Sequence, residues 1–266
     1  MPAEKRTGET VVVVTGAARG LGRSTAEKLA APGVRLVLVD VADQSATVAA
    51  VRGRGATADA VQVDVSSEDQ VVGLARTLAA AHGAPDVLVN NAGISLLRRA
   101  EETSLAQWHD VLAVNLTGPF LCCRELGALM LARGAGSIVN VASVAGLRAV
   151  ADRAAYNASK HGLIGLTVTL AAEWGGRGVR VNAVCPGWIK TEMDEADQAS
   201  GAYRDEDIEN QVPMGRFASP GDVAEAIAFL ADPAKSAFVN GVALPVDGGW
   251  VADASWTSLR LAARGR

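Results

Sequence analysis

Tyr156 and Lys160 are spaced as a general acid/base pair would be on one face of a helix. The string YNASK places them four residues apart in a helical stretch, so their side chains project from the same face. A neighbouring ammonium favours phenolate and lowers the tyrosine pKa from its ordinary value of about 10. A lone pair with this spacing is also common on surface helices, so by itself it leaves both proton transfer and a plain surface contact open.

Ser143 and Asn115 are two polar residues upstream of this pair. Ser143 comes just past a predicted strand and 13 residues before Tyr156, while Asn115 lies in a predicted helix that precedes that strand. Their positions favour the catalytic interpretation of Tyr156 and Lys160.

A glycine-rich turn directly follows the first apolar run. The string TGAARGLG carries Gly16, Gly20 and Gly22 where the first helix would begin. Such glycines let the backbone approach a pyrophosphate, whose charge is met by the helix N-terminus. Close packing of a strand against a helix would use the same glycines, so the turn alone leaves both interpretations open.

Polar side chains end the next three predicted strands. Asp40 ends the second strand, 18 residues beyond Gly22, where an acid accepts hydrogen bonds from adenosine ribose hydroxyls and repels a 2′-phosphate. Asp64 ends the third strand, where it could meet the adenine edge, and Asn91 ends the fourth. Each could be an ordinary cap at a strand end. Together, at successive strand ends, they predict a dinucleotide site.

Seven short apolar runs alternate with longer helical stretches. The runs are VVVV at Val11, VRLVLVD from Val34, AVQVDV from Ala60, DVLVN from Asp86, SIVNVAS from Ser137, VRVNAVCP from Val179 and VALPVD from Val242. Continuous apolar runs are typical of strands buried on both faces, and the helices between them supply parallel crossovers. We predict an α/β fold of the Rossmann type, a doubly wound seven-stranded parallel sheet with helices on both faces. No linker or repeat divides the chain, so residues 1–266 should form a single domain.

A long acidic stretch follows the sixth predicted strand. Residues 192–210 carry eight carboxylates against the single base Arg204, so we expect this stretch to be solvated on at least one side. Open α/β sheets bind ligands where strands end, which favours a substrate lid over a surface insertion. We place this lid at about residues 188–215.

Two other segments favour contacts between subunits. The predicted helix from Ala154 to Trp174 is apolar on nearly every side, which indicates a homo-oligomer, a dimer or tetramer, rather than a third layer within a monomer. The tail, residues 251–266, could cover a neighbouring subunit through Trp256, Leu259 and Leu261, or it could fray.

Composition argues against several classes of protein. The net charge is −4 and no Lys/Arg cluster occurs, so nucleic acid and acidic membranes are not expected partners. The polar first residues precede an apolar run too short for a signal peptide or membrane span, which predicts a cytoplasmic protein. Cys122, Cys123 and Cys185 fit packing roles in a reducing compartment, and the scattered histidines predict no metal site.

These strings closely resemble the short-chain dehydrogenase/reductase family. TGAARGLG, NNAG, VNLTG, VASVAG, YNASK and PGWIKT occur in family order over essentially the whole chain, from about Val11 to Trp250. The resemblance implies an oxidoreductase that transfers a hydride between a nicotinamide dinucleotide and a secondary alcohol or ketone. Protein groups then position the reactants, and the cofactor supplies the redox chemistry.

The resemblance also implies a role for each member of a catalytic tetrad. Tyr156 would exchange a proton with the substrate oxygen, and Ser143 would hydrogen-bond and orient that oxygen. Lys160 would contact the nicotinamide ribose and lower the tyrosine pKa. Asn115 would hold a water that relays protons between Lys160 and solvent.

The motifs and the resemblance together define the expected cofactor site. Its residues are Gly16, Arg19, Gly20, Leu21, Gly22, Asp40, Asp64, Val65, Asn91, Gly93, Tyr156, Lys160, Pro186, Gly187, Ile189 and Thr191. Ile189 and Thr191 would hold the nicotinamide carboxamide. In this family a base such as Arg19 often accompanies a 2′-phosphate, in conflict with Asp40. The repulsion between Asp40 and that phosphate outweighs one exposed arginine, so we predict NAD rather than NADP.

The substrate is expected to be a polyol, a sugar or a small alcohol. A carrier-protein thioester arrives on an acidic partner, which the acidic lid would repel. The pocket lining should come from residues between Ser143 and Tyr156 and from Trp188 with the lid. Arg148 or Arg153 could pair with a substrate anion, but a solvated surface arginine is the commoner case and is expected here. An NADPH-dependent ketoreductase, such as a 3-oxoacyl reductase, is the alternative enzyme. A non-catalytic dinucleotide-binding regulator is the alternative of another class.

Overall fold

Alternate residues of the central strands point to opposite faces of one sheet, and both faces are covered. In β1 (Thr10–Thr15), Val11 and Val13 belong to one buried cluster, whereas Val12 and Val14 belong to another. The strand therefore needs an apolar side chain at every position, which explains its unbroken run of valines. The computed structural model describes residues 8–199, 201, 203–256 and 259–260.

The sheet has seven parallel strands in the order β3-β2-β1-β4-β5-β6-β7. The strands after β1 are β2 (Val34–Asp40), β3 (Thr57–Gln62), β4 (Val87–Asn90), β5 (Gly136–Val141), β6 (Val179–Pro186) and β7 (Ala243–Val246). This confirms the predicted doubly wound sheet in a single Rossmann-like domain. Because all strands run the same way, their carboxyl ends meet at one edge, and the order reverses between β1 and β4.

The edge strand β3 differs from its predicted span. The predicted run began at Ala60, but the strand begins at Thr57 and ends at Gln62. Its burial alternates because β3 has a neighbour on only one side, so a continuous apolar run is not needed there. Val63 and Val65, just beyond the strand, are buried in the core all the same.

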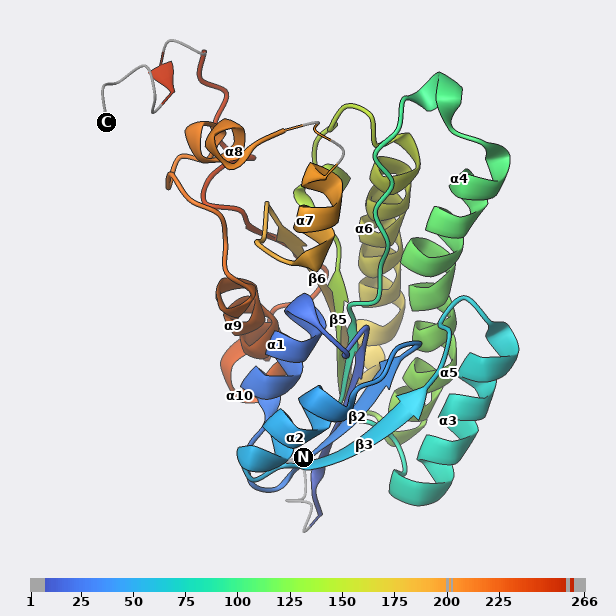
Figure 1. Ribbon diagram of the computed structural model, residues 1–266. Helices are drawn as coiled ribbons and strands as arrows, with labels where there is room; N and C mark the ends of the chain where they lie inside the picture. The colour runs from blue at the N-terminus through green and yellow to red at the C-terminus, as the bar shows by residue number, and fades with distance from the viewer. Residues whose placement is uncertain (1–7, 200, 202, 257–258, 261–266) are drawn as a thin grey trace.

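Helices cover both faces of the sheet (Figure 1). The larger helices are α1 (Gly20–Leu29), α2 (Ser45–Gly53), α3 (Glu68–His82), α4 (Leu105–Leu112), α5 (Gly118–Arg133), α6 (Ala154–Trp174) and α9 (Pro220–Ala231). The shorter ones are α7 (Glu192–Gln198), α8 (Asp205–Gln211) and α10 (Pro233–Ser236). Helices α1, α2 and α9 contribute to the buried cluster on one face, and α3, α5 and α6 contribute to the cluster on the other. In the part of the chain that is described, none of these helices has the length and apolarity to cross a membrane.

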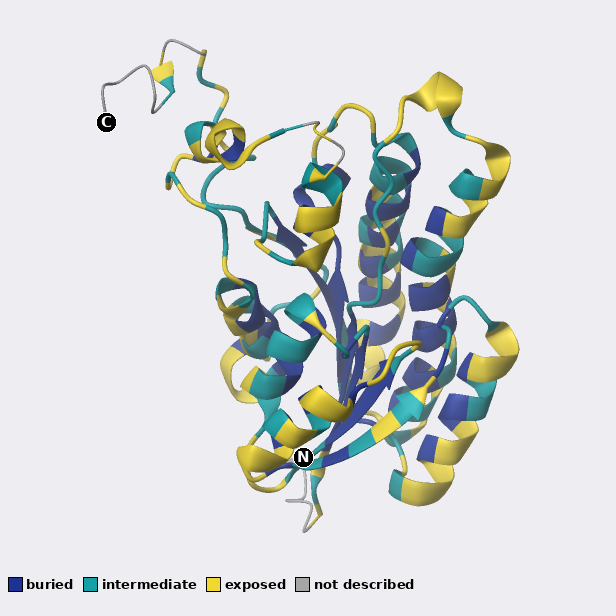
Figure 2. Ribbon diagram, viewed as in Figure 1, coloured by how far each residue is buried: buried dark blue, intermediate teal, exposed yellow. Residues whose placement is uncertain are grey.

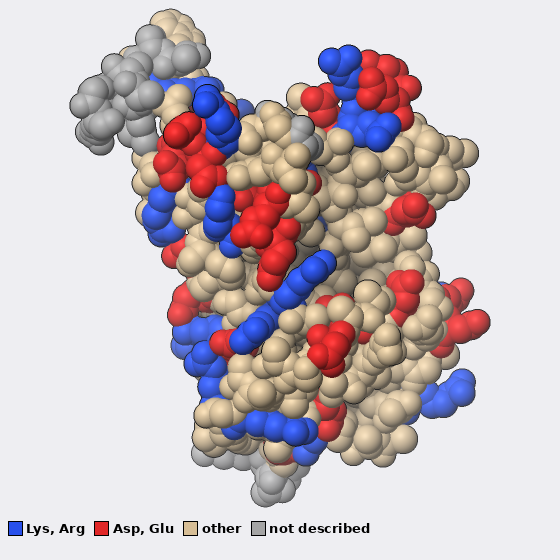
Figure 3. Space-filling view, viewed as in Figure 1, with Lys and Arg blue, Asp and Glu red and all other residues tan. Residues whose placement is uncertain are grey.

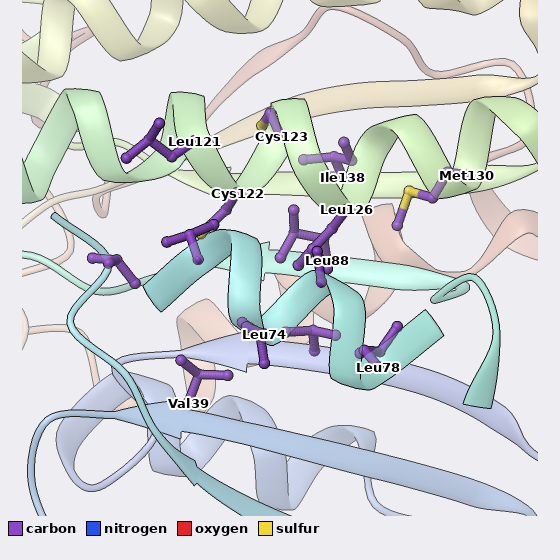
Figure 4. Close-up of a cluster of buried hydrophobic side chains, with 14 of the residues drawn as sticks. Val39, Leu74, Leu78, Leu88, Leu121, Cys122, Cys123, Leu126, Met130 and Ile138 are labelled. Atoms are coloured by element: carbon purple, nitrogen blue, oxygen red, sulfur yellow. The ribbon is translucent and has the colours of Figure 1, made fainter. Parts of the chain in front are cut away.

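The core beneath α3 and α5 is built from interdigitating aliphatic side chains (Figure 4). Leu74 and Leu78 of α3 and Leu126 of α5 meet Leu88 and Ile138 of the sheet. The burial pattern in Figure 2 follows from this arrangement, since the strands and the inner sides of the helices are buried and their outer sides are exposed. All three cysteines are free and buried, as their expected packing role requires.

A chain of buried hydrogen bonds attaches α6 to the sheet. Asn90 Nδ2 of β4 donates to Asn140 Oδ1 of β5 at 2.8 Å, and Asn140 Nδ2 donates to Thr167 Oγ1 of α6 at 2.9 Å. Thr167 in turn donates to the Leu163 carbonyl at 2.7 Å. Polar groups this deeply buried are costly unless paired, so the chain sets the position of α6 against β5.

Replacing the central residue of this chain should destabilise the protein. We expect Asn140→Ala to lower the free energy of unfolding by about 2 kcal/mol or more, because Asn90 and Thr167 both lose a buried partner. Urea denaturation followed by circular dichroism measures this loss. Thr167→Val keeps the shape and breaks only one link to Asn140, so its loss should be smaller. Equal losses in the two variants would contradict the shared-partner explanation.

Candidate active site

A cavity of about 650 Å³ lies at the carboxyl-end edge of the sheet. Every residue that the sequence assigns to the cofactor lines it, and so does Ser143. The cavity continues past Tyr156 and Lys160 to residues of α7 and to Tyr203. The fold thus places the predicted cofactor site and catalytic pair in one continuous space, whereas Asn115 lies behind its wall.

The glycine turn between β1 and α1 is tightly packed on its inner side. A Cβ at Gly22 would lie 1.9 Å from the Gly16 carbonyl oxygen and 2.5 Å from Asn91 Nδ2, and Gly16 itself has φ +66°. Asn91 holds the turn by donating to the carbonyls of Thr15 and Gly16 at 2.9 and 3.0 Å. The turn leaves the N-terminus of α1 facing the cavity, as a bound diphosphate requires, so the residues present fit a dinucleotide.

Asp40 and Asp64 act as local caps and also line the cavity. Asp40 Oδ2 accepts from the Ala18 N–H at 2.9 Å, and its Oδ1 accepts from the Ala42 N–H at 3.0 Å. Asp64 Oδ1 accepts from the Ser66 N–H and hydroxyl at 2.9 and 2.7 Å. These bonds hold both carboxylates in place beside the cavity, so capping and ligand binding are compatible here.

Burial dominates the electrostatics of the Tyr156 and Lys160 pair. Lys160 Nζ lies 5.6 Å from the Tyr156 ring centroid and donates to the Val141 carbonyl at 2.8 Å. Burial lowers the pKa of Lys160 to about 8. Burial also raises the pKa of Tyr156, although the Ser143 hydrogen bond and the Arg153 charge oppose this. The lowered tyrosine pKa expected from the sequence is therefore wrong for the protein alone, because desolvation outweighs the Ser143 hydrogen bond and the Arg153 charge.

Asn115 lies in a π-helical turn, Ala113–Thr117, between α4 and α5. Its Oδ1 accepts from the Ile94 N–H at 2.8 Å, and its Nδ2 donates to the Ile94 carbonyl at 2.9 Å and to Ser159 Oγ at 3.3 Å. A Cβ at Gly93 would come within 3.3 Å of Asn115 Oδ1, which explains the glycine. The Asn115 side chain thus joins the loop after β4 to α6, and its water relay stays a prediction.

Arg153 is a functional candidate that the sequence placed in the pocket lining but not among the predicted site residues. Its side chain is 11% exposed, so the expectation of a solvated arginine is wrong. Its guanidinium donates to Ser95 Oγ at 2.6 Å and to Asp197 Oδ2 at 2.7 Å. Arg153 is the N-cap residue of α6, three residues before Tyr156, and this nearness in the sequence could have identified it. Ser95 and Asp197 carry no comparable signal, because only the fold brings them together.

The acidic segment after β6 folds into the helices α7 and α8. An isolated parallel β-bridge between Ile189 and Ala218 joins the two ends of this segment. Asp194 is buried on the inner side of the segment and accepts from the Tyr203 hydroxyl at 2.8 Å. Acidic side chains gather over α7 and α8 in Figure 3. The segment therefore presents carboxylates on its outer surface and three others, those of Glu192, Asp194 and Asp197, to the cavity.

The chain belongs to the short-chain dehydrogenase/reductase family. A profile described as enoyl-(acyl carrier protein) reductase, which represents this family, matches residues 16–251. The protein is therefore an oxidoreductase that acts on alcohols or ketones with a nicotinamide cofactor. Within the described residues, no group of three or more His, Cys, Asp or Glu side chains could hold a metal ion.

Relatives differ in the substrates that their names give. D-threitol dehydrogenase of Mycolicibacterium smegmatis is 43% identical over 90% of this chain and 92% of that protein. A 3-oxoacyl-[acyl-carrier-protein] reductase of Synechocystis is 42% identical over 91% and 96%. A structure from Beutenbergia cavernae, described as an NAD(P)-dependent gluconate 5-dehydrogenase with NADP bound at low occupancy, has a TM-score of 0.87. It is 40% identical and covers 93% of this chain and 98% of its own.

Glu192, at the start of α7, faces the N-terminus of α1. A Cβ at Gly20 would lie 3.3 Å from Glu192 Oε2, and both residues line the cavity. The helix dipole stabilises a carboxylate at a helix N-terminus, but the negative charge of Glu192 would repel a diphosphate bound at the same place.

Removing that charge should tighten cofactor binding. We expect Glu192→Gln to lower the dissociation constant of NAD about two- to fivefold, as measured by calorimetry. Glu195→Gln is the matched control, because it also removes an acid from the first turn of α7 but does not line the cavity. Equal affinities in the two variants would contradict the prediction.

Proposed function

We propose that the protein is an NAD-dependent dehydrogenase of polyols, sugars or small secondary alcohols that uses Asn115, Ser143, Tyr156 and Lys160. The observation that carries this proposal is the cavity itself, which joins the diphosphate turn, the fixed Asp40 carboxylate and the Tyr156 hydroxyl in one space. The family membership supports the reaction class, and the lining residues support the finer assignment.

The preference for NAD is argued from Asp40. Two backbone N–H groups hold its carboxylate at the end of β2, where an adenosine ribose would lie. A 2′-phosphate placed there would meet a fixed negative charge. Arg19 lines the same cavity and would favour NADP. It does not displace the Asp40 carboxylate, however, whose negative charge would still repel a 2′-phosphate.

The proposed mechanism assigns proton transfer to the protein. A bound nicotinamide dinucleotide supplies the hydride exchange with the carbon that carries the substrate oxygen. Tyr156 takes the hydroxyl proton when an alcohol is oxidised and returns it when a ketone is reduced. Ser143 bonds to Tyr156 and orients the substrate oxygen, and Arg153 favours the phenolate that oxidation needs. Lys160 Nζ lies 5.6 Å from the Tyr156 ring centroid, where a protonated amine would add to this effect.

The polar wall beyond Tyr156 favours a substrate with several hydroxyl groups. Ser95, Arg153, Asp194, Asp197 and Tyr203 line that part of the cavity and offer both donors and acceptors. The outer carboxylates of α7 and α8 disfavour an acidic carrier protein. Reduction of carrier-bound 3-oxoacyl groups is therefore the second candidate activity.

We further propose a cytoplasmic homo-oligomer. The buried free thiols suit a reducing compartment, and the exposed Val168 of α6 and Phe120 of α5 support contact between subunits. We also propose that residues 188–215, approximately, form a substrate lid and that the tail from residue 251 contacts a neighbouring subunit. Trp256 and Leu259 of the tail are exposed, and Leu261 lies outside the described residues.

The cofactor and substrate assignments are tested by one absorbance assay. Wild-type enzyme is assayed with NAD and NADP against polyols, sugars, simple secondary alcohols and a 3-oxoacyl carrier substrate. We expect turnover of a polyol or sugar with NAD, and Asp40→Asn should shift the preference toward NADP because the repelling charge is removed. Turnover with NADP alone, or of the carrier substrate at rates insensitive to salt, would overturn the assignment.

Loss of the phenolic hydroxyl should abolish turnover and spare cofactor binding. We expect Tyr156→Phe to reduce kcat by about a hundredfold or more, the usual contribution of a positioned acid/base. The dissociation constant of NAD, measured by calorimetry, should change little. Retained turnover would refute the mechanism and favour a non-catalytic dinucleotide-binding protein.

A further inference from the structure

Two cations lie beside the ring of Tyr156. Lys160 Nζ is 5.6 Å from the ring centroid, and Arg153 Cζ is 5.8 Å from it. Lys160 follows Tyr156 by one helical turn, whereas Arg153 precedes it at the N-cap of α6. Burial lowers the pKa of Lys160 to about 8, but an arginine stays charged at every pH that the protein tolerates. Arg153 is therefore the permanent positive charge at this phenol.

The main chain fixes the approach of Arg153 to the site. The Arg98 N–H donates to the Asp152 carbonyl at 2.7 Å, and Arg98 pairs with Arg153 in an isolated bridge. Asp152 has φ +59°, a left-handed conformation that aspartate tolerates better than most residues. These contacts lie outside the lid, so the position of the Arg153 backbone does not depend on the lid.

The partner of Arg153 comes from the lid. Asp197 of α7 accepts from Arg153 Nη2 at 2.7 Å and from the Ser95 hydroxyl at 3.1 Å, and Ser95 accepts from Arg153 Nη1 at 2.6 Å. The side chains of Arg153 and Asp197 are only 11% and 14% exposed. Charges this well shielded from water are weakly screened by salt, so each affects Tyr156 at close range.

Two other groups near this site, Ser143 and Asp194, are neutral or already paired. Ser143, from the loop after β5, bonds to it as a neutral hydroxyl. Asp194, on the same helix as Asp197, is already bonded to the Tyr203 hydroxyl at 2.8 Å and paired with Lys190 at 3.4 Å. The electrostatics agree with this geometry, since Arg153 lowers the pKa of Tyr156 and Asp197 raises it.

We propose that Arg153 is a positioning residue that promotes ionisation of Tyr156 and that Asp197 offsets its charge when the lid is closed. Lid closure and proton transfer are thereby coupled through one ion pair. The inference rests on the proposed role of Tyr156, but it adds two residues that lie outside the tetrad. It predicts that loss of the Arg153 charge and loss of the Asp197 charge change the ionisation of Tyr156 in opposite directions.

The test compares the pH profiles of variants that break the same ion pair. In alcohol oxidation, kcat/KM rises with pH as Tyr156 ionises. We expect Arg153→Gln to move this acid limb to higher pH by about half a unit to one unit, and Asp197→Asn to move it to lower pH by a similar amount. Arg153→Lys keeps the charge and should stay near wild type. A bridge that only holds the lid would give shifts of the same sign, or a uniform fall in rate without a shift, and either result would overturn the proposal.

A second readout does not depend on turnover. The chain has two tyrosines, so Tyr203→Phe leaves Tyr156 as the only one. Ultraviolet titration of tyrosinate in that background, with NAD bound, should show the same opposite shifts for Arg153→Gln and Asp197→Asn. Circular dichroism confirms that each variant is folded, and the isosteric Asp197→Asn serves alone if Arg153→Gln fails to fold. An Asp197→Asn titration that does not move to lower pH would overturn the proposal. Retained turnover in Tyr156→Phe would instead refute the proposed function.

Discussion

The protein depends on covering both faces of an all-parallel sheet. Parallel neighbours can be joined only by crossovers, and the crossover helices must then bury an apolar side chain at nearly every strand position. The valines of β1, which divide between two cores, express this requirement most directly. The same constraint brings every strand's carboxyl end to one edge, so the turn after β1, Asp40 at the end of β2 and Asn91 after β4 open onto one cavity.

Within that edge, the cost of burial decides how the acid/base pair behaves. Lys160 is buried and Tyr156 is half-buried in the cavity wall, and desolvation raises the pKa of the phenol and lowers that of the ammonium. Both shifts favour neutral forms, and the positive charge that remains at every pH comes from Arg153. The buried chain from Asn90 through Asn140 to Thr167 holds α6 against the sheet and so keeps this balance in place.

The acidic segment after β6, the proposed lid, adds to the electrostatics as well as to the shape of the site. Glu192 faces the N-terminus of α1, and Asp197 meets Arg153 beside Tyr156, so α7 places carboxylates at both the cofactor end and the substrate end of the cavity. A segment whose composition indicates a solvated surface therefore sends part of its charge inward. Such a lid can influence cofactor binding and proton transfer together.

The sequence by itself determined the sheet and its crossovers, because apolar periodicity is a local property of the chain. The glycine turn and the polar strand ends predicted a dinucleotide site, the family resemblance added the other residues of the predicted cofactor set, and all of them line the cavity. The sequence also placed Tyr156 and Lys160 on one helix face. It misplaced the start of β3, since edge exposure depends on neighbours, and it gave the wrong sign for the tyrosine pKa, since desolvation depends on what the fold packs around the phenol. The pairing of Arg153 with Asp197 was decided only by tertiary structure, because electrostatic contacts across distant segments leave no periodic signal in a single sequence.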